Sequence, residues 1–365
     1  MMGSLPSTQT AALYRPGDVH LSIVHDYPVP KPGRGEVILK VLACGVCHTD
    51  TFLLSGATFD PRTYVLGHEV CGEVVAYGQG VDRDKIRMNQ LYMSLIGDHN
   101  DHGVNGGPAI FNALGTGLDG GYEEYVKVRE DLLVPVPPGV PPEVAAIAAD
   151  AGITAYDAVA NRAGLGPGTN AKVLMFGIGG VGHLGLQYAK HFGATVYACD
   201  IKPEARKLAL ELGATEAFSL LDLNNKITKE SFRVDVVIDF VGINQTFQLG
   251  FNALKPNEVN FPSNPISVIV GVSPENFTLN SADLLATGAK ILSTQYGSRE
   301  DAVKALELFA NGSVRAIVAT EPLTNVNKII DELRAFDVRG RKVVIPHGDH
   351  HGKVREFFHS LHQKS

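Results

Sequence analysis

The sequence predicts an α/β protein in which a doubly wound parallel sheet is combined with a second, mainly-β unit. The chain has 365 residues, and chains of this length divide into more than one domain. From about residue 170, short apolar runs alternate with helical patterns of about a dozen residues, as in a parallel sheet with crossover helices. The first 150 residues instead contain short β-branched runs separated by proline and glycine.

The first half of the chain supplies the predicted β unit. We expect strands in EVILKVLACGV (36–46), EVCGEVVAYG (69–78) and GYEEYVKV (121–128). The stretch 134–149 is rich in proline and then becomes helical, which indicates a connection between two folding units.

The second half supplies the predicted parallel sheet. Buried strands are expected at 173–178, 195–200, 234–242, 266–272 and 290–297, with helices at 182–193 and 203–214. Residues 300–336 predict two amphipathic helices, and 341–346 a last strand. The polar tail holds five histidines, expected at the surface: His347, His350, His351, His359 and His362.

Charge and composition exclude several classes of partner. The net charge of −7 argues against nucleic acid, because phosphate binding requires a basic face. The N-terminus has no apolar core of a signal peptide, and no run of about 18 apolar residues occurs, so no membrane partner is expected. Three of the four cysteines fall within 28 residues beside histidines and acids. That pattern favours metal binding or burial over disulfides, and hence the reducing cytoplasm.

A glycine-rich motif predicts a dinucleotide site. The motif GIGGVG is weak evidence by itself. Here it follows a predicted strand and begins a predicted helix, which is the context in which it indicates dinucleotide binding. Its glycines allow a tight turn and close approach to a pyrophosphate at the helix N-terminus. The expected cofactor-binding residues of this loop are Gly177, Gly179, Gly180, Val181 and Gly182.

Asp200 predicts which dinucleotide binds. It ends the second strand, 18 residues after Gly182. A carboxylate there accepts hydrogen bonds from ribose hydroxyls and repels a 2′-phosphate, so NAD is expected rather than NADP. The alternative is a structural glycine turn with an aspartate that faces solvent.

Two segments of the first half predict a metal site. CGVCHTD (44–50) and LGHEVCGEV (66–74) contain Cys47 and His68, which are ligands of the type that zinc prefers. A catalytic zinc usually has three protein ligands and one open position. These two residues therefore leave one ligand to come from elsewhere in the chain.

The chain resembles the zinc-containing medium-chain alcohol dehydrogenases. The matching motifs are CGVCHTD (44–50), GHE-x-x-G-E-V (67–74), DGGYEEYV (119–126), GIGGVGHLGLQYAK (177–190) and YGSREDAVKALELFANG (296–312), in the order of that family. The resemblance covers about residues 10–345. It implies a GroES-like catalytic domain at 1–155 and 297–365, around a Rossmann domain at 156–296.

The resemblance also implies roles for individual residues. Cys47 and His68 would be zinc ligands, Asp50 would orient His68, and Glu69 would lie beside the metal as an exchangeable or outer ligand. Thr49 would hydrogen-bond the substrate oxygen, and His48 would approach the cofactor phosphates or ribose. The expected cofactor contacts elsewhere are Thr154, Gly271 and Val272 at the nicotinamide and Arg341 at the pyrophosphate.

The third zinc ligand is where this chain departs from its apparent relatives. Many of them carry a cysteine at the place that Asp150 occupies in DAGIT (150–154). A carboxylate also binds zinc and keeps the formal charge of the site, so Asp150 is the expected third ligand. The alternative is that Asp150 caps the N-terminus of a helix that starts there.

Two further departures concern zinc number and proton transfer. The stretch 93–115 lacks the four cysteines that hold a second, structural zinc in many relatives, and its Asp98, His99, Asp101 and His102 are expected to form a solvated loop. One zinc per chain is therefore expected. Phe52 occupies the place of a histidine that ends a proton relay in many relatives, so the expected proton route from Thr49 runs through a ribose hydroxyl and water, with His48 as a candidate participant.

The sequence therefore predicts an NAD-dependent zinc alcohol dehydrogenase. It would exchange hydride between a small alcohol and its aldehyde or ketone, and would form a homodimer or homotetramer. One alternative is a zinc-free reductase, or a lyase or isomerase of the same fold that uses nicotinamide. A more remote alternative is a dinucleotide-binding protein without catalytic activity.

Overall fold

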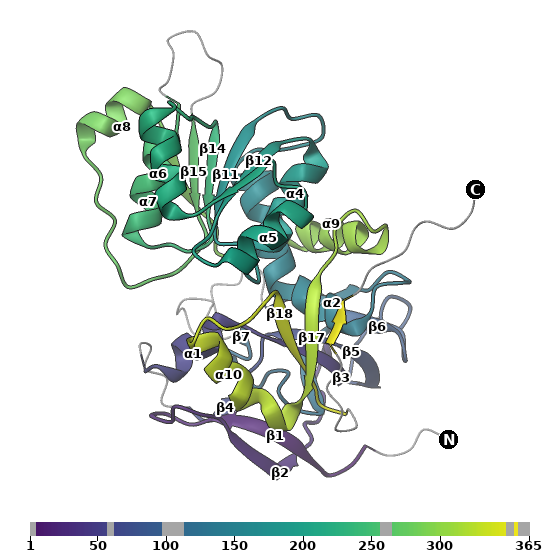
Figure 1. Ribbon diagram of the computed structural model, residues 1–365. Coiled ribbons are helices and arrows are strands. Elements are labelled where there is room, and N and C mark those ends of the chain that lie inside the picture. Colours follow the sequence, from purple (N-terminus) through teal and green to yellow (C-terminus); the bar gives the residue numbers. More distant parts are fainter. Residues whose placement is uncertain (1–4, 57–61, 97–112, 256–264, 348–353, 357–365) are drawn as a thin grey trace. The chain divides into compact units, whose positions relative to one another are not determined.

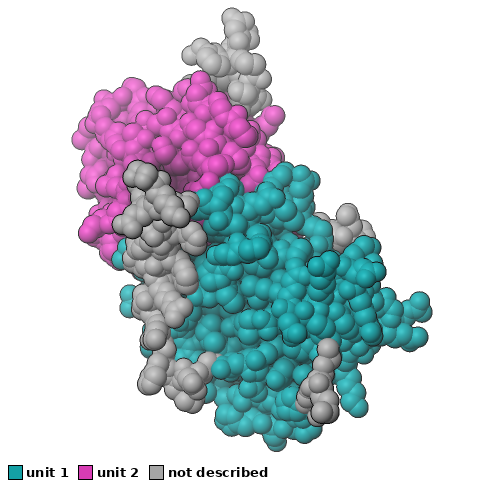
Figure 2. All heavy atoms as spheres, turned by 90° about the vertical axis from the view of Figure 1, so that its right-hand side faces the viewer, with its two compact units in different colours: residues 1–150, 298–312, 316–365 teal, residues 151–297, 313–315 magenta. Residues whose placement is uncertain are grey.

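The structure, a computed structural model, describes residues 5–56, 62–96, 113–255, 265–347 and 354–356. The chain divides into two compact units (Figure 2). Unit 1 comprises Met1–Asp150, Ser298–Gly312 and Ala316–Ser365, and unit 2 comprises Ala151–Gly297 and Ser313–Arg315. Each unit is described below by itself.

Unit 1 is built mainly from β-strands. Its largest sheet has the strand order β10-β6-β5-β3-β18-β17-β19, with β9 paired to β3. In chain order these strands are β3 (Glu36–Val46), β5 (Glu69–Tyr77), β6 (Leu91–Ser94), β9 (Tyr125–Arg129), β10 (Leu133–Pro135), β17 (Ile317–Pro322), β18 (Arg341–Ile345) and β19 (Val354–Glu356). The smaller sheets are β2-β1-β4 and β7-β8, formed by β1 (Thr8–Tyr14), β2 (Ser22–Pro28), β4 (Tyr64–Val65), β7 (Ala113–Leu114) and β8 (Gly117–Leu118).

The long strand β3 organises unit 1, because β5, β9 and β18 all pair with it antiparallel. Its residues Val37, Ile38, Leu39 and Val41 are fully buried. The helices of this unit are α1 (His48–Leu54), α2 (Pro142–Ile147), α9 (Arg299–Ala310) and α10 (Val326–Arg334). The 3₁₀ turns are η2 (Glu130–Leu132) and η5 (Leu323–Asn325).

Unit 2 contains a parallel sheet of six strands in the order β13-β12-β11-β14-β15-β16 (Figure 1). The strands are β11 (Lys172–Phe176), β12 (Thr195–Cys199), β13 (Glu216–Phe218), β14 (Val236–Asp239), β15 (Ile266–Ile269) and β16 (Lys290–Ser293). The chain adds strands first on one side of β11 and then on the other, so the strand order reverses there. This is the Rossmann order, and ligands bind at the carboxyl ends of the strands beside the reversal.

Helices connect the strands of this sheet. They are α4 (Gly182–Phe192), α5 (Pro203–Glu211), α6 (Leu220–Lys229), α7 (Asn244–Ala253) and α8 (Ser281–Thr287), whereas α3 (Ile153–Tyr156) precedes β11. One core cluster joins Leu174 and Phe176 of β11 to Leu223 of α6 and Phe251 of α7, all buried. One face of the sheet is therefore covered by α6 and α7, which lie side by side (Figure 1).

The fold class predicted from the sequence is confirmed. All five predicted strands of the parallel sheet are present, though each is shorter than its apolar run. The sequence missed β13 (Glu216–Phe218) of the parallel sheet and β17 (Ile317–Pro322) between the two predicted helices α9 and α10. It also missed the shorter strands of unit 1: β1, β2, β4, β6, β7, β8, β10 and β19. Within the described residues, no helix has the length and apolar character needed to cross a membrane.

Candidate metal centre and dinucleotide site

The first ligand candidate, Cys47, lies at the junction of a strand and a helix. β3 ends at Val46, and Cys47 precedes α1 in an extended conformation. Its backbone N–H donates to Asp50 Oδ2 at 2.9 Å, which closes the first turn of the helix. The Cys47 side chain is 8% exposed, and its sulfur lies 3.5 Å from the Thr49 hydroxyl oxygen.

His68 and Glu69 come from the start of β5. Gly67, immediately before His68, has a φ of +94°, which favours glycine. Glu69 pairs with Gly45 across the sheet, and a Cβ on Gly45 would lie 1.8 Å from Glu69 Oε2. Gly45 therefore leaves the space that the Glu69 side chain occupies.

Asp150 lies in the interior of a helical run. This run consists of α2, the π-helical segment η3 (Ala148–Gly152), α3 and a second π-helical segment, η4 (Asp157–Arg162). Eight helical residues precede Asp150, so the alternative that Asp150 caps a helix N-terminus is wrong. π-helical turns insert an extra residue and occur often at functional sites.

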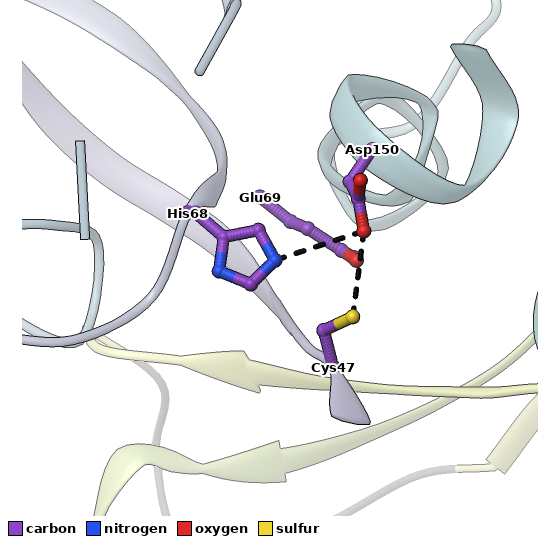
Figure 3. Close-up of side chains that lie close together, drawn as sticks. All are labelled: Cys47, His68, Glu69 and Asp150. Carbon is purple, nitrogen blue, oxygen red and sulfur yellow. Dashed lines mark hydrogen bonds and ion pairs between the residues drawn. The ribbon is translucent and has the colours of Figure 1, made fainter. Parts of the chain in front are cut away.

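The four side chains Cys47, His68, Glu69 and Asp150 come together in unit 1 (Figure 3). One ligand atom from each lies within 4.8 Å of the others. Asp150 Oδ2 is 3.4 Å from Cys47 Sγ and 3.6 Å from His68 Nε2. Two atoms bound tetrahedrally to zinc, at about 2.0–2.3 Å each, lie roughly 3.3–3.8 Å apart. The spacing of the donor atoms thus fits a zinc ion.

The pKa shifts of His68 and Asp150 also suit a bound metal ion. Burial lowers the pKa of His68, but its contacts with Asp150 and Cys47 outweigh burial and hold the pKa well above its ordinary value. Burial raises the pKa of Asp150, but the contact with His68 outweighs it, so that pKa is depressed. The His68 shift shows that Asp150 and Cys47 attract positive charge, and the Asp150 shift shows that its carboxylate is stabilised as the anion beside a cation; both suit a bound metal ion.

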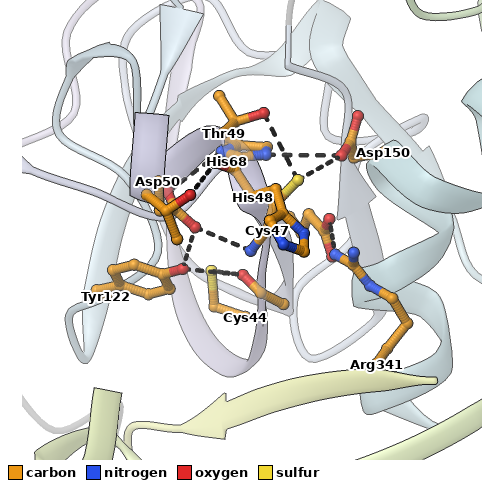
Figure 4. A network of polar contacts seen from close by, with 12 residues as sticks. Cys44, Cys47, His48, Thr49, Asp50, His68, Tyr122, Asp150 and Arg341 are labelled. Atoms are coloured by element: carbon orange, nitrogen blue, oxygen red, sulfur yellow. Dashed lines mark hydrogen bonds and ion pairs between the residues drawn. The ribbon is translucent and has the colours of Figure 1, made fainter. Parts of the chain in front are cut away.

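Asp50 lies on the far side of the His68 ring (Figure 4). Asp50 Oδ1 is 3.6 Å from His68 Nδ1, and among the described residues neither atom has a hydrogen-bond partner. Asp50 Oδ2 accepts hydrogen bonds from the Cys47 amide and, at 2.6 Å, from the Tyr122 hydroxyl. Sequence reasoning missed Tyr122, although it ends the DGGY motif that contributed to the resemblance.

Arg341 lies beside the cluster and pairs with Glu69. Its Nη2 donates to Glu69 Oε1, and both side chains are buried. Burial raises the pKa of the Glu69 carboxyl to about 8, against the opposing effect of Arg341, and the charge of Asp150 raises it further. The sequence suggested a contact of Arg341 with the cofactor pyrophosphate, which stays a prediction; its pairing with Glu69 was not foreseen.

His48 contacts the C-terminal end of α10. Its Nε2 donates to the Leu333 carbonyl at 3.1 Å, and its ring stacks on Phe336 with centroids 5.5 Å apart. Phe336 has a φ of +54°, a conformation that glycine usually adopts after a helix. The predicted contact of His48 with the cofactor stays a prediction.

The glycine-rich loop of unit 2 lies between β11 and α4. Gly177 has a φ of +80°, and a Cβ on Gly182 would lie 1.9 Å from the Gly177 carbonyl oxygen. A Cβ on Gly179 would meet no described atom within 4 Å. Gly177 and Gly182 are thus required by the turn itself, whereas Gly179 borders open space. Gly180 and Val181 complete the loop, with Val181 just before α4.

Asp200 follows β12 and is fixed by two backbone amides. Its Oδ2 accepts from Ile178 N at 2.8 Å, and its Oδ1 accepts from Lys202 N at 2.9 Å. The carboxylate therefore joins the glycine-rich loop to the end of β12. Its position at the carboxyl edge of the sheet is the one at which Rossmann domains bind the adenosine ribose.

The remaining cofactor candidates also belong to unit 2. Gly271 and Val272 follow β15, at the same edge of the sheet as the glycine-rich loop, and Val272 is 84% exposed. Thr154 lies in α3 and is 9% exposed. The predicted loop of Asp98, His99, Asp101 and His102 lies outside the described residues, as do the tail histidines except His347.

Comparison with known proteins identifies the family of the chain. Residues 33–138 match the alcohol dehydrogenase GroES-like domain, and residues 180–311 match the zinc-binding dehydrogenase domain. An alcohol dehydrogenase of Geobacillus stearothermophilus is 31% identical over 88% of this chain and 95% of the relative.

Two solved structures share the fold along nearly the whole chain. An acetophenone reductase of Geotrichum candidum, solved in complex with NAD, has a TM-score of 0.80 and 31% identity, covering 94% of this chain and 98% of that one. An alcohol dehydrogenase of Aeropyrum pernix has a TM-score of 0.79 and 28% identity, covering 92% and 100%. The chain belongs to the zinc-containing medium-chain alcohol dehydrogenase family, as its sequence motifs indicated, and is an oxidoreductase.

Proposed function

We propose that this protein is an NAD-linked, zinc-dependent alcohol dehydrogenase that interconverts a small alcohol and its aldehyde or ketone. The observation that carries the proposal is the meeting of Cys47, His68 and Asp150 with donor spacings of 3.4 and 3.6 Å. These three residues would hold the zinc, with Glu69 beside it as an outer or exchangeable ligand. Bound zinc would supply a Lewis acid for the substrate oxygen.

The protein's own groups prepare this site. Because a carboxylate only accepts hydrogen bonds, Asp50 favours the His68 tautomer with its proton on Nδ1, and this leaves the Nε2 lone pair facing the cluster. The Thr49 hydroxyl, 3.5 Å from Cys47 Sγ, is placed to exchange a hydrogen bond with an alcohol oxygen beside the cluster. Proton transfer at that oxygen would thus begin at Thr49.

Unit 2 supports NAD as the hydride acceptor. The open space beside Gly179 and the N-terminus of α4 suit a pyrophosphate. The carboxylate of Asp200 suits a ribose without a 2′-phosphate. We assign Thr154, Gly271 and Val272 to the nicotinamide, in keeping with the family.

The zinc-free alternatives are disfavoured by the metal cluster. A reductase, lyase or isomerase without a metal has no need for four metal-binding side chains within 4.8 Å, three of them buried and Asp150 half-buried. Burying such groups without a common partner is costly. A dinucleotide-binding protein without catalytic activity would need them still less.

We also propose a homodimer or homotetramer located in the cytoplasm. The edge strand β16 pairs only with β15 among the described strands, and all four of its residues are exposed. Such an edge can pair with a second copy of itself. All four cysteines are free thiols, in keeping with a reducing compartment.

The test combines metal analysis with an activity screen. Purified protein is expected to contain zinc and to form NADH from NAD with at least one member of a panel of primary and secondary alcohols. The panel includes the alcohol of acetophenone, because a similar structure is named for that ketone. Zinc-free protein that reduces enoyl or quinone substrates would favour the zinc-free reductase. Protein that binds NAD without turning over any substrate would favour the non-catalytic dinucleotide-binding protein.

A further inference from the structure

Asp50 connects two segments that supply metal ligands. Through Oδ2 it accepts the backbone N–H of Cys47, and through Oδ1 it faces His68 Nδ1. The torsion that turns an aspartate carboxylate about its Cβ–Cγ bond is broad, so the Cys47 amide alone would leave the plane of this carboxylate poorly fixed. A second partner is needed to keep Oδ1 directed at His68.

Tyr122 is that second partner. Its hydroxyl donates to Asp50 Oδ2 at 2.6 Å, and the same oxygen is 3.2 Å from the Gly45 carbonyl. Tyr122 and Asp50 are both 0% exposed, so no water competes for the hydrogen bond. Hydrogen bonds to a buried carboxylate are short and strong.

The Tyr122 side chain also contacts the segment that carries His68. Its backbone N–H donates to the Leu66 carbonyl at 3.0 Å. A Cβ added to Gly67 would lie 2.6 Å from the Tyr122 ring, so the ring packs directly against the residue before His68. One side chain thus touches both ligand-bearing segments: its ring packs against Gly67, and its hydroxyl bonds Asp50 (Figure 4).

We propose that Tyr122 is a positioning residue of the metal centre, which acts through Asp50 to hold His68 and Cys47 in ligating geometry. The inference rests on the zinc site proposed above and adds a residue that the family comparison does not assign. Without the hydroxyl, Asp50 Oδ2 keeps only the Cys47 amide, the carboxylate can turn, and Oδ1 is no longer held facing His68 Nδ1. Outer partners of zinc ligands typically contribute 10- to 100-fold to metal affinity.

The experiment compares two tyrosine-to-phenylalanine variants of the full chain. Tyr122→Phe removes the hydrogen bond to Asp50. Tyr92→Phe is the matched control, since Tyr92 is also 0% exposed and its hydroxyl bonds Arg87 N at 2.9 Å and Gln90 at 3.0 Å, away from the cluster. For each we would measure the zinc dissociation constant by competition with a chelator, the visible spectrum of the cobalt-substituted protein, and the thermal unfolding of the metal-free form.

Tyr122→Phe is expected to weaken zinc binding by about tenfold and to alter the cobalt spectrum, whereas Tyr92→Phe changes neither. If Tyr122 has a purely structural role, Tyr122→Phe will behave like Tyr92→Phe: thermal stability will fall, but the zinc dissociation constant and the cobalt spectrum will not change. That result would overturn the proposal. If Tyr122→Phe does not fold, fluorotyrosine at position 122 keeps the ring and changes the donor strength of the hydroxyl. An unchanged zinc affinity would then overturn the proposal.

The outcomes also separate this inference from the proposed function. A wild-type protein that binds zinc but oxidises no alcohol overturns the dehydrogenase proposal, and the metal readouts for Tyr122 still decide its role. A wild-type protein that takes up no zinc overturns both.

Discussion

Asp150 Oδ2 lies 3.4 Å from Cys47 Sγ, although 103 residues separate the two in the chain. The π-helical segment η3 places Asp150 in this position, and the end of β3 places Cys47. A cysteine and an aspartate at this distance, with an imidazole nitrogen 3.6 Å from the same carboxylate oxygen, form a mixed S, N and O donor set suited to zinc.

Replacing Asp150 should therefore release the metal. We expect Asp150→Ala to lower zinc affinity by roughly 100-fold or more and to abolish alcohol oxidation, because the site keeps only two of its three ligands. Asp150→Cys should retain zinc, since a thiolate is an equivalent ligand. Glu143→Gln, in the first turn of the same helical run, serves as the control. Full zinc and normal turnover in Asp150→Ala would show that the carboxylate is not a ligand.

The number of metal ions follows from the donor groups. We expect about one zinc per chain by elemental analysis, because the described residues contain a single cluster of suitable side chains. Removing zinc with a chelator should lower the melting temperature, since the metal binds the folded state alone. Two tightly held metals per chain would show that residues 93–115 form a second site.

The sequence could predict the fold because its signals are local. Apolar runs gave the five strands of the parallel sheet, and GIGGVG gave the turn before α4. β17 was missed because Ile317–Pro322 is short and only half-buried, so its hydrophobic pattern resembles a loop between two helices. The π-helical segments were missed because hydrophobic periodicity does not distinguish them from an ordinary helix.

The site could be predicted only in part because its contacts are long-range. Cys47 and His68 lie in recognisable motifs, and the resemblance identified Asp150. The pairing of Arg341 with Glu69 spans 272 residues, and that of Tyr122 with Asp50 spans 72. Neither leaves a periodic signal in the sequence. The pairing of β18 with β3 and of β3 with β5 brings Arg341 near Glu69, whereas Tyr122 and Asp50 both lie outside the strands.

Cofactor preference should depend on the charge of Asp200. Asp200→Asn keeps the size of the side chain but removes the repulsion of a 2′-phosphate. We expect the ratio of kcat/KM for NAD to that for NADP to fall at least about tenfold, equivalent to about 1.4 kcal/mol. Asp235→Asn is the matched control: Asp235 also accepts a backbone N–H, from Lys172 at 2.8 Å, but precedes β14 at the opposite edge of the sheet. A wild type that prefers NADP would contradict the assignment of Asp200.

Glu123 should make the stability of the protein depend on pH. It is 0% exposed, its Oε2 accepts from Gln9 Nε2 at 2.9 Å, and its Oε1 has no hydrogen-bond partner among the described residues. Burial, and secondarily the charge of Asp119, hold the pKa of this carboxyl well above its ordinary value. In an unfolded chain the pKa of a glutamate is about 4.3.

The sign of the effect follows from this upward shift. A group whose pKa is raised on folding binds its proton more tightly in the folded state. Its contribution to stability is therefore complete below the unfolded pKa and is lost as the pH rises through the folded pKa. We expect the melting temperature of zinc-loaded protein to fall as the pH rises from the unfolded to the folded pKa of Glu123. Glu123→Gln should reduce this fall, because the amide of glutamine does not titrate. Glu204→Gln, at the exposed start of α5, is the control. An identical pH profile for wild type and Glu123→Gln would show that Glu123 is already ionised throughout, with its charge compensated inside the fold.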